Sequence, residues 1–189
     1  MRKPLCHIAD IRVGYSFRTK IENDPAGDER VLQISDIRNI AVLDPQELPL
    51  VRWSVASTPP LLRPGDVVMP ARVEHYDALV VESDEPTVAS GQLFVIAPKS
   101  TTVCPDYLCW FLNQPESQNY ILKNRAGSSI PSLSRAVLSD LPVALPSQEA
   151  QQKILDLAQL WQREQLLSQQ LLANRQKMLD GIYSKFLES

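Results

Sequence analysis

Few side chains in this sequence could support metal binding. It contains three cysteines, Cys6, Cys104 and Cys109, and only two histidines, His7 and His75. A structural zinc site needs four such ligands at compact spacings, and no Cys-x-x-Cys pair is present. We therefore expect no metal and no cofactor, and we expect the cysteines to be reduced and mostly buried, as in a cytosolic protein.

Residue combinations that carry catalysis are also missing. The glycines form neither a G-x-G-x-x-G nor a Walker-type loop, and no Gly-x-Ser-x-Gly occurs. Asp10, Asp36 and Asp66 each stand near a turn or strand end, where carboxylates usually cap backbone N–H groups. A Cys–His nucleophile would require a cysteine to meet His75 in space, which nothing in the sequence indicates. The sequence thus predicts no enzyme.

Three polar segments combine side chains suited to contacting DNA. Residues 12–20 mix basic and aromatic side chains around Gly14, residues 72–77 carry donors and acceptors, and residues 123–129 run from basic groups into small hydroxyls. Arginine and lysine bind phosphate or guanine, although each segment could equally be a solvated loop. The candidate DNA-binding residues are Arg12, Tyr15, Arg18, Lys20, Arg72, His75, Tyr76, Lys123, Arg125, Ser128 and Ser129.

The elements that would position these segments form a mixed α and β domain. Arg63-Pro64-Gly65-Asp66 predicts a tight turn. Apolar β-rich runs predict strands, and Pro105 in a first turn favours a helix after it. The predicted strands cover residues 30–37, 67–69, 79–81 and 93–96, the helices cover 105–113 and 116–123, and an extended segment covers 141–145.

A composition boundary lies at Pro146. All 15 prolines occur at or before it, and Gly181 is the only glycine after it. Ser147 is a suitable N-cap, and Glu149 lies in the first turn, where the helix dipole favours a negative charge. We therefore predict a compact domain over residues 1–146 and one long helix over residues 147–189.

The predicted long helix carries a broad apolar stripe. Its rows of residues seven apart resemble an imperfect coiled-coil seam that Glu164 and Asn174 interrupt. The candidate dimer-interface residues are Leu157, Leu160, Trp161, Leu167, Leu171, Asn174, Met178 and Ile182.

The length of this helix also indicates a partner. About 40 residues make a rod of about 60 Å, whereas a domain of this size is about 40 Å across. An overhanging helix with an apolar stripe needs another helix against it. The alternative is a helix that breaks near Gly181 and folds back.

The formal net charge is −3, which argues against a protein that binds nucleic acid through excess positive charge alone. Its basic groups must then be clustered, or a partner must supply most phosphate contacts. No apolar run reaches 18 residues and the N-terminus lacks a secretory apolar region, so we expect a cytoplasmic protein without a membrane span.

The order of several segments resembles type I restriction-modification specificity subunits, namely one target-recognition domain plus a conserved helix. The segments are Ile8 to Phe17, Leu62 to Val68, Ala89 to Ile96, Tyr107 to Asn113, Gly127 to Ser134, and Leu141 to Ile154. The resemblance covers essentially the whole chain. It implies an α+β fold with a compact, mixed, strongly twisted β-sheet domain, short helices and one long coiled-coil-forming C-terminal helix.

The resemblance also implies a function. Such subunits normally hold two recognition domains joined by two antiparallel helices, and each domain recognises half of a split DNA site. They are non-catalytic and dock methyltransferase subunits, which use S-adenosylmethionine, and in some complexes restriction subunits. With one domain and one helix, this chain looks like a half-subunit. An antiparallel homodimer should recognise an interrupted palindrome, because protein symmetry is mirrored in the DNA.

Two other function classes remain open from the sequence. One is a coiled-coil adaptor or regulator of a defence complex that does not contact DNA, which the slightly acidic balance favours. A gel-shift assay with and without a methyltransferase would separate it from the DNA-binding hypothesis. The other is a stand-alone enzyme, whose turnover would depend on His75 or a cysteine.

Overall fold

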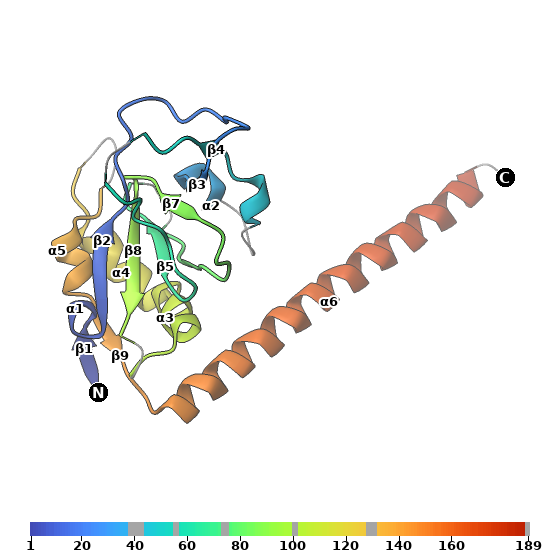
Figure 1. Ribbon diagram of the computed structural model, residues 1–189. Coiled ribbons are helices and arrows are strands. Elements are labelled where there is room, and N and C mark those ends of the chain that lie inside the picture. Colours follow the sequence, from blue (N-terminus) through green and yellow to red (C-terminus); the bar gives the residue numbers. More distant parts are fainter. Residues whose placement is uncertain (38–43, 55–56, 73–75, 100–101, 128–131, 188–189) are drawn as a thin grey trace. The chain divides into compact units, whose positions relative to one another are not determined.

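The computed structural model describes residues 1–37, 44–54, 57–72, 76–99, 102–127 and 132–187. The chain divides into two compact units, Met1–Gln148 and Glu149–Ser189 (Figure 1). The first unit holds three small β-sheets and several short helices, and the second is a single long helix.

A four-stranded antiparallel sheet forms the centre of the first unit. Its strand order is β2 (Ala9–Val13), β8 (Leu93–Pro98), β5 (Val67–Pro70) and β6 (Leu79–Val80). In register, Arg12 pairs with Val95, and Val67 pairs with both Ile96 and Val80. Successive side chains of β5 are all buried, because both faces of this strand are covered.

A second sheet has the order β4 (Leu50–Val51), β3 (Glu29–Leu32) and β7 (Thr87–Ala89). Strand β7 runs parallel to β3, and β4 runs antiparallel to it. A third pair joins β1 (Arg2–Pro4) to β9 (Pro142–Ala144), so the two ends of the unit meet. A buried apolar cluster that includes Leu32, Ala89 and Val95 joins the first two sheets.

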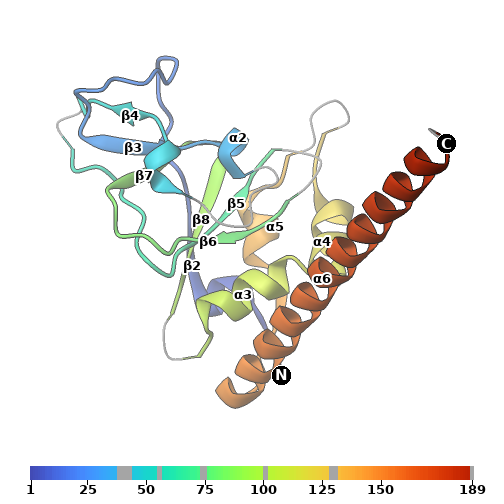
Figure 2. The same ribbon diagram turned by 90° about the vertical axis from the view of Figure 1, so that its right-hand side faces the viewer.

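The first unit also contains short helices and one 3₁₀ turn. They are α1 (Leu5–Ile8), α2 (Ile34–Ile37), the 3₁₀ turn η1 (Pro45–Glu47), α3 (Pro105–Leu112), α4 (Pro115–Asn124) and α5 (Arg135–Ser139). In Figure 2, the second sheet and the pair α3–α4 lie on different sides of the central strands. Helix α5 begins at Ser134, whose side chain accepts a hydrogen bond from the N–H of Val137.

The second unit is helix α6 (Gln148–Leu187), 40 residues long and unbroken at Gly181, so the alternative of a break there is wrong. All of its large apolar side chains from Leu157 onward are exposed. Within the described residues, no helix is both long and apolar enough to cross a membrane.

The structure confirms the α+β fold class and most predicted elements, including the turn at 63–66, where Gly65 has a φ of +90°. The predicted strand over residues 30–37 is wrong beyond Leu32, because residues 34–37 form α2. There the Asp36 carboxylate accepts a hydrogen bond of 2.8 Å from the N–H of Gln33 and turns the chain.

Candidate nucleic-acid interface

Strands β2, β5 and β8 share one end of the central sheet. Antiparallel pairing places Val13, the last residue of β2, opposite Phe94, and Pro70, the last residue of β5, opposite Leu93 at the start of β8. Segments that follow β2 and β5 therefore leave the sheet at the same end, uppermost in Figure 1. We call this the loop end; it comprises residues 14–20, 71–72, 90–92 and 126–127 and Ser132.

Two glycines allow the first candidate segment to pack closely against residues 89–93. The N–H of Gly14 donates to Leu93 O at 2.9 Å, and the N–H of Tyr15 donates to Ala89 O at 2.7 Å. A Cβ on Gly14 would lie 2.1 Å from the carbonyl oxygen of Ser90, and a Cβ on Gly91 would lie 2.6 Å from Ser16 Oγ. The two sequence segments around these glycines thus pack directly on each other, and at Gly14, where the contact is with backbone, only glycine permits that approach.

An aromatic cluster fixes the start of this segment. The ring centroids of Tyr15 and Phe17 are 4.9 Å apart, and Trp53 lies 4.8 Å from Tyr15. Trp53 is held by hydrogen bonds from its backbone N–H to Asp28 and from its indole N–H to Ser57 O. Tyr15 is therefore half-buried in packing with other rings, which leaves it partly available to a ligand. Sequence reasoning missed Trp53, which joins the cluster from a distant strand end.

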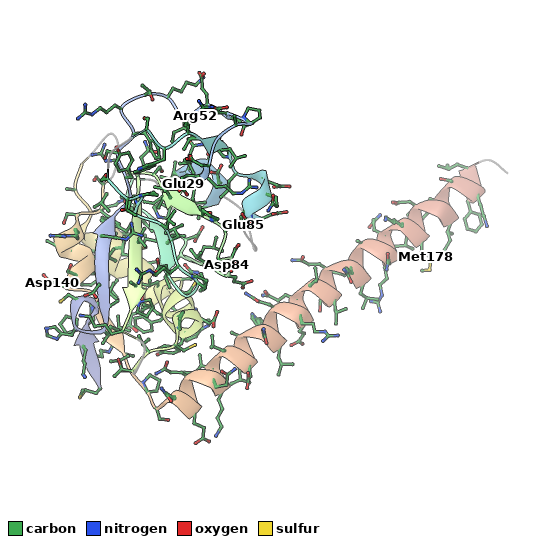
Figure 3. The ribbon with its side chains drawn as sticks, viewed as in Figure 1. Glu29, Arg52, Asp84, Glu85, Asp140 and Met178 are labelled. Carbon is green, nitrogen blue, oxygen red and sulfur yellow. The ribbon has the colours of Figure 1, made fainter. Side chains whose placement is uncertain are left out.

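Exposed basic side chains follow the aromatic cluster. Arg18 and Lys20 are both exposed, and Lys20 makes a surface ion pair of 3.5 Å with Glu22. Arg52 extends from the end of β4 and pairs with Asp24 at 3.5 Å (Figure 3). Sequence analysis did not select Arg52. Such exposed pairs are weak, so DNA phosphate can compete for these cations.

Arg12 has a different environment from the other candidates. It is half-buried, and its Nη2 donates to Leu61 O at 3.0 Å. Burial lowers the pKa of the Arg12 guanidinium, and the nearby Asp66 carboxylate partly opposes this shift. Arg12 thus braces β2 against residue 61, a structural contact that sequence reasoning did not anticipate.

The second and third candidate segments lie side by side. The N–H of Ala71 donates to Gln92 O at 2.8 Å, and Ala71 O accepts from the N–H of Leu133 at 2.9 Å. Ala126 and Ser132 exchange backbone hydrogen bonds of 2.9 and 2.8 Å, which close the loop after α4. This arrangement joins the segment that carries Arg72 to the one that follows Lys123 and Arg125.

The side chains of these segments differ in accessibility. Arg72 and Lys123 are exposed, whereas Arg125 is half-buried, and its Nη1 has no hydrogen-bond partner among the described residues. The prediction that Tyr76 contacts DNA is wrong, because its side chain is 0% exposed and belongs to the core. Gln118 of α4 donates a hydrogen bond of 3.0 Å from its Nε2 to the backbone carbonyl oxygen of Tyr76. His75, Ser128 and Ser129 lie outside the described residues.

A family model described as the type I restriction modification DNA specificity domain matches residues 4–172. The chain belongs to this family. The resemblance inferred from the sequence is thereby confirmed, and specificity domains of this kind are non-catalytic. The match includes all three candidate segments and more than half of α6. No curated protein sequence matches the chain significantly.

Three solved structures have the same fold as this specificity domain. The HsdS subunit from Thermoanaerobacter tengcongensis has a TM-score of 0.64 at 18% identity, over 87% of this chain and 37% of that one. The type I S subunit from M. genitalium has a TM-score of 0.56 at 10% identity, with 86% and 39% covered. A chain from a structure on complex assembly and conformational transition of the type I R-M system has a TM-score of 0.58 at 20% identity, with 87% and 38% covered. This chain therefore spans about two fifths of the length of each matched chain, since 37–39% of those chains is covered.

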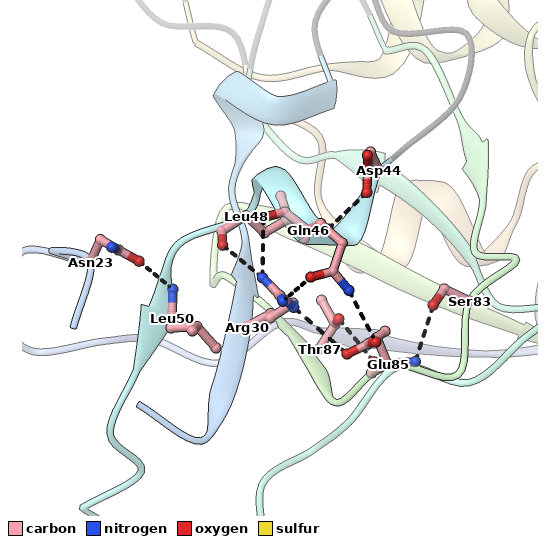
Figure 4. A network of polar contacts seen from close by, with 9 residues as sticks. All are labelled: Asn23, Arg30, Asp44, Gln46, Leu48, Leu50, Ser83, Glu85 and Thr87. Carbon is pink, nitrogen blue, oxygen red and sulfur yellow. Dashed lines mark hydrogen bonds and ion pairs between the residues drawn. The ribbon is translucent and has the colours of Figure 1, made fainter. Parts of the chain in front are cut away.

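A polar network stiffens the second sheet of the specificity domain (Figure 4). Arg30 Nη2 donates to Gln46 Oε1 at 2.6 Å, and Arg30 Nε lies 3.7 Å from Glu85 Oε2. Gln46 Nε2 closes the triangle with a hydrogen bond of 3.1 Å to Glu85 Oε1. The Arg30 side chain is only 13% exposed, so this cation supports the fold and is not available to DNA.

The described titratable groups of the specificity domain do not form a metal-binding cluster. Among the described residues, no three His, Cys, Asp or Glu side chains gather as a metal site would require. Cys109 Sγ donates to Ala78 O at 3.2 Å, and burial raises the pKa of this thiol to about 12. Cys104 and Cys109 are half-buried, but Cys6 is exposed, so the expectation of mostly buried cysteines is wrong for Cys6.

Proposed function

We propose that this chain recognises a specific DNA sequence through its loop end. The observation that carries the proposal is that three segments, far apart in the sequence, meet at one end of the central sheet. There the first two segments present the exposed cations Arg18, Lys20 and Arg72, and the exposed Lys123, at the end of α4, precedes the third segment. Arginine and lysine on loops that a rigid sheet positions are suited to phosphate and guanine.

The net negative charge of the chain indicates that a partner contributes to DNA binding. With a net charge of −3, the chain has no overall attraction for DNA, so we infer that a partner supplies phosphate contacts beside those of the clustered cations. We infer that this partner is a DNA methyltransferase subunit, joined in some complexes by a restriction subunit. The specificity domain would then select the site at which the partner acts.

The proposal extends to pairing of two copies. Residues 1–146 would form the recognition domain, and residues 147–189 the helix for pairing and partner docking. The exposed apolar side chains of α6 support an antiparallel homodimer, in which each copy recognises half of an interrupted palindrome. The chain would thus act as a half specificity subunit.

Selection from a library of random duplex DNA, at one fixed salt concentration, tests this function. The full chain is used alone and with a candidate type I methyltransferase subunit. Enrichment of an interrupted palindrome is expected. Enrichment of an asymmetric site would support DNA recognition but contradict two-fold pairing. Absence of any enriched sequence in both arms would contradict DNA recognition and favour a coiled-coil adaptor.

A further inference from the structure

Helix α6 carries a regular seam of eight exposed residues. They alternate in spacing between four and three, which is the period of a coiled-coil core. The seam consists of Leu157, Trp161, Glu164, Ser168, Leu171, Arg175, Met178 and Ile182. Met178 projects from the helix in Figure 3, and Leu160, Leu167, Leu172 and Leu179 flank the seam. The two charged members, Glu164 and Arg175, interrupt an otherwise mostly apolar row.

The charges of the seam cannot satisfy each other within one helix. Glu164 and Arg175 are separated by three helical turns, which is about 16 Å along the axis. Among the described residues, neither has an ion-pair partner. A helix that packs on this seam must therefore supply the opposite charge at two places.

The seam is complementary to itself when reversed. If a second α6 lies antiparallel with the two-fold axis between Gln169 and Gln170, Leu157 lies level with Ile182 of the second copy and Trp161 with Met178. Ser168 then lies level with Leu171, and Glu164 with Arg175. These are the layers that an antiparallel coiled coil forms, and the Glu164–Arg175 pair occurs twice, once on each side of the two-fold axis.

We propose that α6 pairs with α6 of a second copy of this chain in this one antiparallel register, with two symmetric Glu164–Arg175 ion pairs across the seam. The proposal rests on the antiparallel dimer proposed above and adds its register and the ion pairs that fix it.

Charge complementarity excludes the competing arrangements. A parallel pair in register places Glu164 against Glu164 and Arg175 against Arg175. An antiparallel pair shifted by one heptad places Arg175 against Leu157, or Glu164 against Ile182, and leaves charges unpaired in an apolar seam. Desolvating an unpaired charge is costly, and like charges repel. The ion pairs therefore favour this register over the alternatives.

Charge reversal in the full-length chain tests the register, with the dimer dissociation constant measured by sedimentation equilibrium. Glu164→Arg or Arg175→Glu alone should each weaken the homodimer by about 10- to 100-fold, because both cross-helix pairs become like-charged. The double variant should recover wild-type affinity. An equimolar mixture of the two single variants should form heterodimers, since both cross pairs then join arginine to glutamate.

Arg163→Glu is the matched control, because this exposed arginine lies outside the seam, and its dissociation constant should stay close to that of the wild type. Circular dichroism verifies that every variant keeps its helix content. A wild-type dimer whose single variants bind as tightly as before would overturn the register and leave the dimer intact. A wild-type chain that stays monomeric at all concentrations would overturn both the dimer and its register. The selection from random duplex DNA would still test DNA recognition independently.

Discussion

The backbone N–H of Leu133 donates a hydrogen bond of 2.9 Å to the carbonyl oxygen of Ala71. This contact joins the end of the loop after α4 to the residue that precedes Arg72. Because Ala71 also donates to Gln92 O, the same strand end is tied to the segment that seats Tyr15. Three separate polar segments thereby become one surface.

Arg72 at the loop end and Lys123 at the adjoining end of α4 are expected to contribute unequally to DNA binding. Arg72→Ala should weaken binding to the selected site by about 1–3 kcal/mol and relax its specificity, as for an arginine that contacts a base. Lys123→Ala should weaken binding to all sequences and lower the salt dependence, as for a phosphate contact. Gel shifts on the selected and a scrambled duplex at several salt concentrations measure both effects.

Lys99→Ala is the charge-matched control for these variants. Lys99 follows β8 at the opposite end of the central sheet, where it pairs with Asp10 at 3.1 Å. Its removal should leave DNA binding unchanged. If the three variants lose affinity equally, the loop end has no special role.

The close approach at Gly14 predicts a strong effect of one added methyl group. A Cβ there would lie 2.1 Å from the Ser90 carbonyl oxygen, so the backbone must separate. Gly14→Ala should lower the free energy of unfolding by about 1–3 kcal/mol, the usual cost of overpacking. Urea denaturation of the full chain measures it, and an unchanged midpoint would contradict the packing described here.

Gly181→Ala should have the opposite effect. Apart from the helix's own nearby backbone, no described residue would lie within 4 Å of a Cβ at this position of α6, and glycine is a poor helix former. The substitution should stabilise the helix by about 1 kcal/mol. Thermal melts followed by circular dichroism should show higher helix content at intermediate temperatures, and a loss of helicity would refute the prediction.

Cys109 predicts a decline in stability at alkaline pH. Burial raises the pKa of its thiol from 9.0 to about 12, so the folded state holds a proton that the unfolded state releases. The free energy of unfolding should therefore fall as pH rises from 9 toward 12. Urea denaturation at several pH values should show a flatter decline for Cys109→Ala, and an identical decline would exclude this thiol as a cause.

Arg30→Ala should destabilise the second sheet. The substitution leaves Glu85 and Gln46 without their shared partner, and the Arg30 side chain is only 13% exposed. The expected loss is about 2–3 kcal/mol in the free energy of unfolding. Arg52→Ala, which removes an exposed ion pair with Asp24, should cost less than about 1 kcal/mol. Equal losses in chemical denaturation would show that the network adds nothing beyond a surface pair.

Local patterns in the sequence determined most elements of this protein. The turn at 63–66, the proline-led helix α3 and the start of α6 after Ser147 each depend on neighbours a few residues away, so they were predictable. The family resemblance likewise followed from the order of short segments, and the family match confirms it.

Only the tertiary structure decided which polar residues face solvent and which segments meet. Tyr76 is flanked by His75 and Asp77 in a polar stretch, yet its side chain is buried in the core. Trp53 contacts Tyr15 from the segment that follows β4 in the second sheet. The loop end exists because β2 and β5 both pair with β8, a strand distant from them in the sequence. Such pairings depend on non-local burial and hydrogen bonding, which no local pattern of residues encodes.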